Sequence, residues 1–225
     1  MLQNHIINKY TICVIRFYYF WIILMVIPII SIALISCHKA GDIRVAIQPF
    51  RGMEAHLTDT ICAVIQKTYR CRVDVLDDIV MPANFYTQIK SPRYRADSIL
   101  IYLRKTKSDS FDIVLGLTHF DISFTKTDER GRTKQPVSKY GDWGIFGLAH
   151  CPGESCVASS FRLNHINKRL WRERLKKVSI HEVGHTMGLR HCSSINCVMT
   201  DVEEHIQNLD NAPSTLCNQC RQKLK

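Results

Sequence analysis

The chain has 225 residues, and its 30 lysines and arginines against 20 aspartates and glutamates give a formal net charge of +10. Hydrophobic residues make up 46% of it, which excludes a disordered protein and suffices for one filled domain. The basic residues are spread out and no nucleic-acid-binding motif accompanies them, so we expect no nucleic-acid partner. A monomer is the default expectation.

The N-terminus predicts a leader. Residues 17–35 are almost entirely apolar and follow Lys9 and Arg16, with no acidic residue before them. A charged segment followed by an apolar one is typical of a secretory signal. Residues 34–37, Leu-Ile-Ser-Cys, resemble a bacterial lipobox, in which Cys37 is lipidated and becomes the first residue. We therefore expect a signal peptide at residues 1–36, a lipid-anchor linker at 37–41 and the folded domain at 42–225.

An uncleaved signal anchor is the alternative for this leader, because nineteen apolar residues can cross a bilayer. In both cases the positive-inside rule places the folded domain outside the cytoplasm. The expected location is therefore the cell envelope, as an exported lipoprotein or a single-pass membrane protein.

Strands and helices alternate through the first half of the folded domain. Buried strands are expected at residues 43–50, 72–80 and 111–117. Amphipathic helices are expected between them, at residues 54–68 and 95–106. This alternation predicts an α/β fold with a mixed, mainly parallel sheet and helices packed on it.

The second half begins with a polar stretch, residues 125–140, that predicts a loop. Two further strands are expected at residues 143–150 and 157–163. A long helix should follow, starting at an N-cap of Asn164 or Asn167 and ending at Gly188. The dense basic run at residues 169–177 is expected on the solvated face of that helix.

The end of this helix carries an HExxHxxGxxH pattern. His181 and His185 are one turn apart, so their imidazoles project from one face and converge on one cation. A glycine at 188 permits the sharp turn that lets His191 reach the same ion. Three neutral histidines leave the fourth position of a zinc for water, and Glu182 is placed to take a proton from it. The pattern predicts a catalytic zinc.

Four cysteines follow directly, in the spacing C-x4-C, a gap of nineteen residues, then C-x2-C. They are Cys192, Cys197, Cys217 and Cys220. Two chelating pairs separated by a loop favour a structural zinc held by four thiolates. Two disulfides are the alternative, which an oxidising envelope would favour.

Other cysteines leave similar choices open. Disulfides between Cys62 and Cys71 and between Cys151 and Cys156 would suit an exported protein. Free buried thiols are the alternative, because unpaired cysteine is commonly buried.

Together, the two motifs at residues 181–220 resemble those of the archaemetzincins, which are zinc metalloproteases of the metzincin group. Weaker family-like features lie at residues 111–121 and 159–163, whereas the leader departs from the family. The resemblance implies a single metzincin-like domain with a small C-terminal four-cysteine zinc subdomain. It also implies that residues 143–150 form the rim of the substrate cleft.

The same resemblance implies a role for each motif residue. It makes His181, His185 and His191 the ligands of the catalytic zinc, Glu182 the general base and acid, and Met199 the Met-turn residue beneath the ion. It places a second zinc on the four cysteines.

We therefore expect a metallopeptidase with two Zn²⁺ that acts on a peptide or protein. A catalytically weak zinc-binding or regulatory protein and a hydrolase of non-peptide amides are the alternatives. No tyrosine follows Tyr140, so His150 and His205 remain as candidate oxyanion donors, with ordinary surface histidines as the other interpretation.

Overall fold

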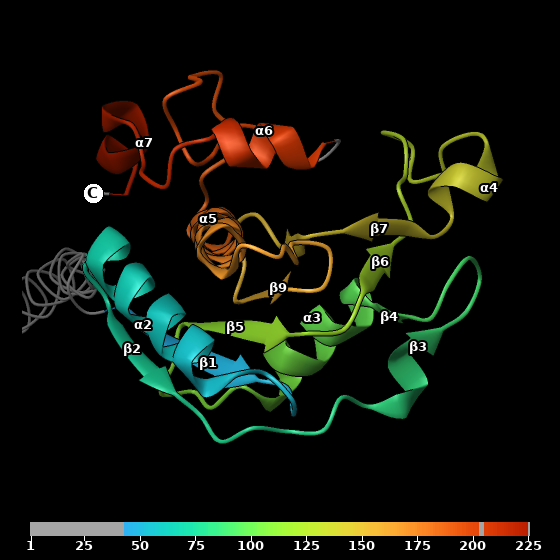
Figure 1. Cartoon of the computed structure of the whole chain (residues 1–225), viewed down its shortest axis with the longest axis horizontal. Coiled ribbons are helices and arrows are strands. Elements are labelled where there is room, and N and C mark those ends of the chain that lie inside the picture. Colours follow the sequence, from blue (N-terminus) through green and yellow to red (C-terminus); the bar gives the residue numbers. More distant parts are fainter. Residues whose placement is uncertain (1–42, 203–204, 225) are drawn as a thin grey trace, which may run out of the picture. The chain divides into compact units, whose positions relative to one another are not determined.

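The computed structural model describes residues 43–202 and 205–224 (Figure 1). The predicted leader, including Cys37, lies outside these residues and stays a prediction. Incorporation of a labelled fatty acid at Cys37 would distinguish a lipoprotein from an uncleaved signal anchor. Among the described residues, no helix has the length and apolar character needed to cross a membrane.

The main sheet has five strands in the order β2-β1-β5-β9-β8. The parallel strands are β1 (Arg44–Pro49), β2 (Arg72–Val75), β5 (Ile113–Thr118) and β9 (Ser155–Ser159). The edge strand β8 (Gly147–Ala149) runs antiparallel to β9. The predicted mixed, mainly parallel sheet is therefore confirmed.

Helices cover both faces of this sheet. Helices α2 (Ala55–Tyr69) and α5 (Lys168–Thr186) share one hydrophobic core with Ile47 and Leu115 of the sheet. Helix α3 (Ala96–Thr106) packs on the other face, in a core that includes Val114. Neighbouring strand residues therefore enter different cores, which explains why β1 and β5 read as continuous apolar runs.

A second, four-stranded sheet was not predicted. It consists of β3 (Tyr86–Thr87), β4 (Arg93–Arg95), β6 (Ile122–Phe124) and β7 (Trp143–Ile145), in that order. Strands of two or three residues are too short to show a hydrophobic period, so sequence patterns do not find them.

Several predicted strand boundaries differ from those in the structure. The expected strand at residues 143–150 is two strands, β7 and β8, in different sheets. The expected strand at 72–80 ends at Val75, and the one at 157–163 is Ser155–Ser159. The remaining short helices are η1 (Ala83–Phe85), α4 (Val137–Tyr140) inside the predicted loop, α6 (Ile206–Asn211) and α7 (Asn218–Gln222).

Helix α5 begins where an asparagine caps it. Asn167 Oδ1 accepts hydrogen bonds from the backbone N–H groups of Arg169 at 3.0 Å and Leu170 at 3.3 Å. The helix ends at Thr186, and Gly188 has a φ of +88°. Asn167, one of the two expected caps, is thus the N-cap, and glycine supplies the left-handed turn after the helix.

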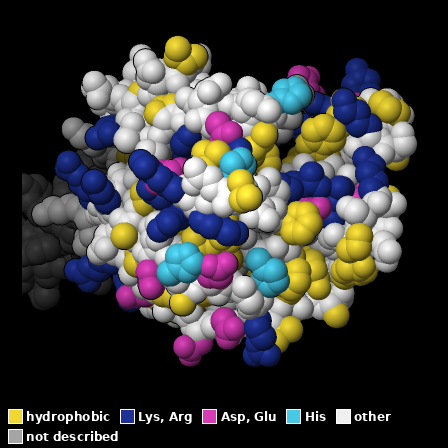
Figure 2. All heavy atoms as spheres, viewed as in Figure 1, with side chains coloured by type: hydrophobic (Ala, Val, Ile, Leu, Met, Phe, Trp, Pro, Cys, Tyr) yellow, Lys and Arg dark blue, Asp and Glu magenta, His cyan; other side chains and the backbone are white. Residues whose placement is uncertain are grey.

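The basic run on α5 is only partly solvated, contrary to expectation. Arg174 and Lys177 are 6% and 9% exposed because α6 covers them. Arg174 donates two hydrogen bonds of 2.6 Å to the Asp210 carboxylate on α6. On the face shown in Figure 2, lysine and arginine side chains are interspersed with acidic and hydrophobic ones.

A buried ion-pair network joins the second sheet to the segment before α5. Asp121 accepts from Arg162 Nε at 2.6 Å and from Arg93 Nε at 2.9 Å. Arg93 also reaches Asp142 Oδ2 at 3.0 Å. The carboxyl side chains of Asp121 and Asp142 are 5% and 0% exposed. The two weaker family-like features, which contribute Asp121 and Arg162, therefore meet in one network.

We expect Asp121→Asn to lower the free energy of unfolding by about 3 kcal/mol, because it leaves two guanidinium groups short of a buried charge partner. Denaturant unfolding measures this loss. Asp97→Asn is the matched control: Asp97 pairs with Arg95 at 3.0 Å, but its side chain is 52% exposed, and we expect a change below about 1 kcal/mol. Equal losses in the two variants would contradict a structural role for the network.

Candidate active site

Three imidazoles converge at the C-terminal end of α5. His181 and His185 lie on the same face of the helix, with their Nε2 atoms 2.9 Å apart. The ring of His191 lies 5.3 Å from that of His181 and 5.0 Å from that of His185, measured between centroids. One ring nitrogen of each residue lies within 4.8 Å of the others. The arrangement suits one metal ion bound by three nitrogen ligands.

Backbone carbonyls orient two of these rings. His181 Nδ1 lies 2.8 Å from the carbonyl oxygen of Val198, and His185 Nδ1 lies 2.6 Å from that of Leu189. A carbonyl only accepts, so Nδ1 carries the proton and Nε2 offers its lone pair. Burial, with a smaller effect from neighbouring His185, lowers the pKa of His181 to about 4. His181 is therefore neutral at pH 7, as a metal ligand must be.

His191 has a different partner. Its Nδ1 lies 3.6 Å from the Asp201 carboxylate, and the side chains of His191 and Asp201 are 40% and 60% exposed. The third predicted ligand therefore lies at the open side of the cluster.

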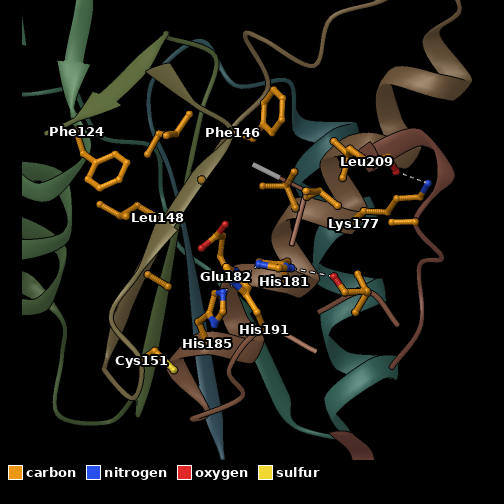
Figure 3. A pocket seen from close by; sticks show the side chains of 17 residues that line it. Phe124, Phe146, Leu148, Cys151, Lys177, His181, Glu182, His185, His191 and Leu209 are labelled. Atoms are coloured by element: carbon orange, nitrogen blue, oxygen red, sulfur yellow. Dashed lines mark hydrogen bonds between the residues drawn. The ribbon is translucent and has the colours of Figure 1, made fainter. Parts of the chain in front are cut away.

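Glu182 lies beside the histidines and is 8% exposed. Figure 3 shows its side chain next to His181, between α5 and the strand that carries Leu148. This placement brings a carboxylate next to the three histidines, although Glu182 is not one of the three convergent ligands.

These residues line a cavity of about 270 Å³. One wall is the segment around β8, including Phe146 and Leu148 (Figure 3). The opposite wall is apolar and comes from α5, the segment after His191 and α6. Its members are Val178, Val198, Val202, Leu209 and Ala212.

Lys177 extends this apolar wall with its aliphatic stem. Its Nζ donates to the carbonyl oxygens of Leu209 and Asp210, both at 2.8 Å, near the end of α6. In Figure 3 the side chain runs away from Glu182 and the histidines toward Leu209. Burial lowers the pKa of Lys177. The ammonium group thus anchors α6, and the cavity beside it is suited to an apolar side chain.

The rim of the cavity is an edge strand. Strand β8 pairs with β9 on one side and is the last strand of its sheet among the described residues. An unpaired edge of this kind can accept an extended peptide through main-chain hydrogen bonds. Of residues 143–150, which were expected to form the rim, only Gly147–Ala149 form the edge strand of the main sheet, while Ile145 and Phe146 also line the cavity.

The four cysteines after His191 form a second cluster. Their sulfur atoms all lie within 4.8 Å of one another. Cys192 Sγ lies 3.9 Å from Cys217 Sγ, and Cys197 Sγ lies 3.7 Å from Cys220 Sγ. Four sulfurs about 2.3 Å from one zinc would be about 3.8 Å apart, so the cluster fits a tetrahedral zinc. A disulfide needs about 2.05 Å.

The cysteine cluster is tied to the histidine cluster through the backbone. The N–H of Cys192 donates to the carbonyl oxygen of Met199, and the N–H of Val198 donates to that of Thr215, both at 2.8 Å. The Val198 carbonyl that orients His181 therefore lies in a segment held by the four cysteines.

Comparison with known proteins adds the family. The model of peptidase family M54 matches residues 43–225. The chain belongs to this family. The match starts after the predicted leader, and family membership makes the chain a zinc metallopeptidase.

Its similar relatives are archaemetzincins. The protein from Archaeoglobus fulgidus is 30% identical over 182 residues, which cover 81% of this chain and 99% of that protein. The protein from Halobacterium salinarum is 26% identical over 187 residues, which cover 79% of this chain and 97% of that protein. The recognition of the archaemetzincin family from residues 181–220 is therefore confirmed.

Solved archaemetzincins share the fold. The structure from Methanopyrus kandleri superposes with a TM-score of 0.67 at 26% identity, covering 84% of this chain and 97% of that one. The structure from Archaeoglobus fulgidus, a complex with malonate, has a TM-score of 0.63 at 27% identity and covers 80% and 99% of the two chains.

The structure of this M54 peptidase decides two choices that the sequence left open. His150 and His205 are exposed and absent from the cavity lining, so neither lies where an oxyanion donor should be. All eight cysteines in the described part of the chain are free.

Of the two alternatives left open outside the cluster, the structure has free thiols and not the two disulfides. Cys156 is fully buried within β9, whereas Cys151 is exposed and its Sγ contacts the Leu189 carbonyl oxygen at 3.5 Å. Cys71 is buried, and burial raises the pKa of its thiol to about 11.

Two contacts of the M54 site were missed from sequence. Met199 is fully buried and packs against Gly184, where an added Cβ would lie 2.5 Å from Met199 Sδ. Gly147 makes a similar close approach to Glu182. The sequence signal for both contacts was a glycine in an otherwise regular helix or strand, which often marks close approach of another group, and for the first contact there was also the expected Met-turn role of Met199.

Proposed function

We propose that the chain hydrolyses peptide bonds, with Glu182 as general base and acid beside a zinc held by His181, His185 and His191. One observation carries the proposal: three convergent imidazoles and a buried carboxylate share a cavity under an edge strand. When bound there, zinc acidifies a water molecule and polarises the substrate carbonyl.

The protein side chains supply the proton transfers. Glu182 accepts a proton from the attacking water at its carboxylate and gives it to the nitrogen of the leaving amine. Its burial keeps competing water away from the carboxylate. The carbonyl groups of Val198 and Leu189 hold two of the imidazoles in the orientation that ligation requires.

We further propose that the cysteine cluster holds a second, structural zinc, which makes two per chain. The support is the spacing of the four sulfurs and the burial of Cys197 and Cys220. Four thiolates leave no open position, so this metal would stabilise the segment and take no part in the reaction.

The cavity also suggests how a peptide binds. An extended peptide would pair antiparallel with β8. One of its side chains would then enter the cavity and pack against the apolar wall formed by α5 and α6. Lys177 leaves this wall apolar because its ammonium group is bound elsewhere.

Profiling of a peptide library tests the proposal. We expect the zinc-loaded protein to cleave peptides next to medium-sized apolar residues, and a chelator to abolish cleavage until zinc is returned. Mass spectrometry of the products identifies the sites. A zinc-loaded protein that cleaves no peptide would favour the catalytically weak binding protein instead, and cleavage restricted to non-peptide amides would favour the other alternative.

A further inference from the structure

Gly147 is the point at which the rim strand touches Glu182. It begins β8, pairs with Ala158 of β9 and lines the cavity. A Cβ added to Gly147 would lie 2.6 Å from Cγ, 2.7 Å from Oε1 and 2.8 Å from Cδ of Glu182. Non-bonded carbon atoms normally approach to about 3.5–4.0 Å. Even a methyl group therefore does not fit between the strand and this side chain.

The backbone at Gly147 does not itself require glycine. The described glycines with positive φ are Gly52, Gly131 and Gly188. Gly147 is not among them, so alanine could adopt its conformation without the strain of the left-handed region. The contact with Glu182 is the feature that excludes a side chain at this position.

Strands lie against one side of Glu182, and the cavity lies on another. The residue is 8% exposed and lines the cavity with His181. Cys156 of β9 lies near Glu182 and is fully buried. Burial is the larger cause that raises the pKa of the Cys156 thiol, and the negative charge of Glu182 is the smaller one. An added methyl group on β8 would therefore force the Glu182 side chain toward the cavity, which takes the carboxylate out of its present place beside the histidines.

We propose that Gly147 is a positioning residue for Glu182: the bare backbone at the start of β8 holds the glutamate side chain in its place beside the three histidines. This inference rests on the proposed role of Glu182. In this account Gly147 meets the substrate only through its main chain, as the rest of β8 does, and its missing side chain affects the reaction through the Glu182 carboxylate.

The expected consequence is a catalytic defect without a binding defect. A general base works within about 2.6–3.2 Å of the proton it takes. A misplacement of about 1 Å can cost about 100-fold in rate. Peptide binding to β8 uses the main chain, which alanine retains. Gly147→Ala should therefore lower kcat about 100-fold and change KM less than about threefold.

A double-mutant cycle separates this contact from damage to the strand. Thermal unfolding is measured for the zinc-loaded wild type, Gly147→Ala, Glu182→Ala and the double variant, each with its zinc content. We expect Gly147→Ala to lower Tm by about 2–10 °C when Glu182 is present. In the Glu182→Ala background, where Cγ and the carboxylate are gone, the same change should lower Tm by less than about 1 °C.

Gly131→Ala is the control for strain remote from the site: its φ of +74° makes alanine unfavourable there, but a Cβ at Gly131 meets nothing within 4 Å and the residue lies outside the cavity lining. It should keep wild-type kcat and KM. A Gly147→Ala variant with wild-type kcat would overturn the inference, and so would an equal loss of Tm in both backgrounds. Full activity of Glu182→Gln would instead refute the proposed function, and the unfolding cycle would still report on the contact.

Discussion

Glu182→Gln should abolish peptide hydrolysis while leaving the zinc content of the protein unchanged. The amide of glutamine is isosteric with the carboxylate but cannot accept the proton of the attacking water. General acid–base catalysis contributes about 10²–10⁴-fold, so kcat should fall by at least that factor. KM should change little, because Glu182 is not one of the three convergent nitrogen ligands. The measurements are steady-state kinetics on a cleaved peptide and metal analysis of the same samples.

Glu173→Gln is the matched control for this variant. Glu173 lies on the same helix, but its side chain is 39% exposed and pairs with Lys176 at 2.8 Å, one turn away. It should keep wild-type kcat and KM. If Glu182→Gln cleaved peptides at the wild-type rate, the proposed mechanism would fail. If Glu182→Gln lost zinc as well as activity, the loss of activity would no longer report on proton transfer.

Cys197→Ser should remove the structural zinc that we propose for the cysteine cluster, and with it most of the activity. Cys197 is fully buried, and its Sγ accepts a hydrogen bond from the N–H of Cys217 at 3.4 Å. Structural zinc contributes about 10–16 kcal/mol of apparent binding free energy in small zinc-binding peptides. Without it, we expect the segment that contains the Val198 carbonyl to lose its position, so that His181 is no longer oriented.

The expected size is a loss of about 100-fold or more in kcat/KM, with new proteolytic cleavage at residues 189–220. Cys62→Ser is the control, because Cys62 lies on α2 outside the cluster and should keep both zinc ions and full activity. A Cys197→Ser protein with one zinc and wild-type kcat/KM would show that the two clusters act independently.

The strongest predictions from sequence were those that depend on local spacing. His181 and His185 converge because a helix places residues four apart on one face. His191 joins them because the chain turns at Gly188, whose φ is +88°. The alternating order of strand and helix likewise predicted the mainly parallel sheet.

The errors and the choice left open have a common physical origin. The split of residues 143–150 into β7 and β8 depends on which sheet offers a partner edge. The burial of Lys177 depends on α6, because the carbonyl groups of Leu209 and Asp210 accept hydrogen bonds from its ammonium group and replace solvent there. The choice between a Cys151–Cys156 disulfide and free thiols, open in the sequence, depends on β9, which buries Cys156 in the core. In each case the deciding contact is with an element distant in sequence, which a local pattern does not show.

The amino-acid sequence by itself determined the family and the residue types available at the site, because the identities and spacing of the histidines, Glu182 and the cysteines between His181 and Cys220 are local properties. The tertiary structure alone decided how that chemistry is held in place. The carbonyl that orients His181, the apolar wall around Leu209 and the glycine against Glu182 come from different elements, and only packing brings their atoms within contact distance.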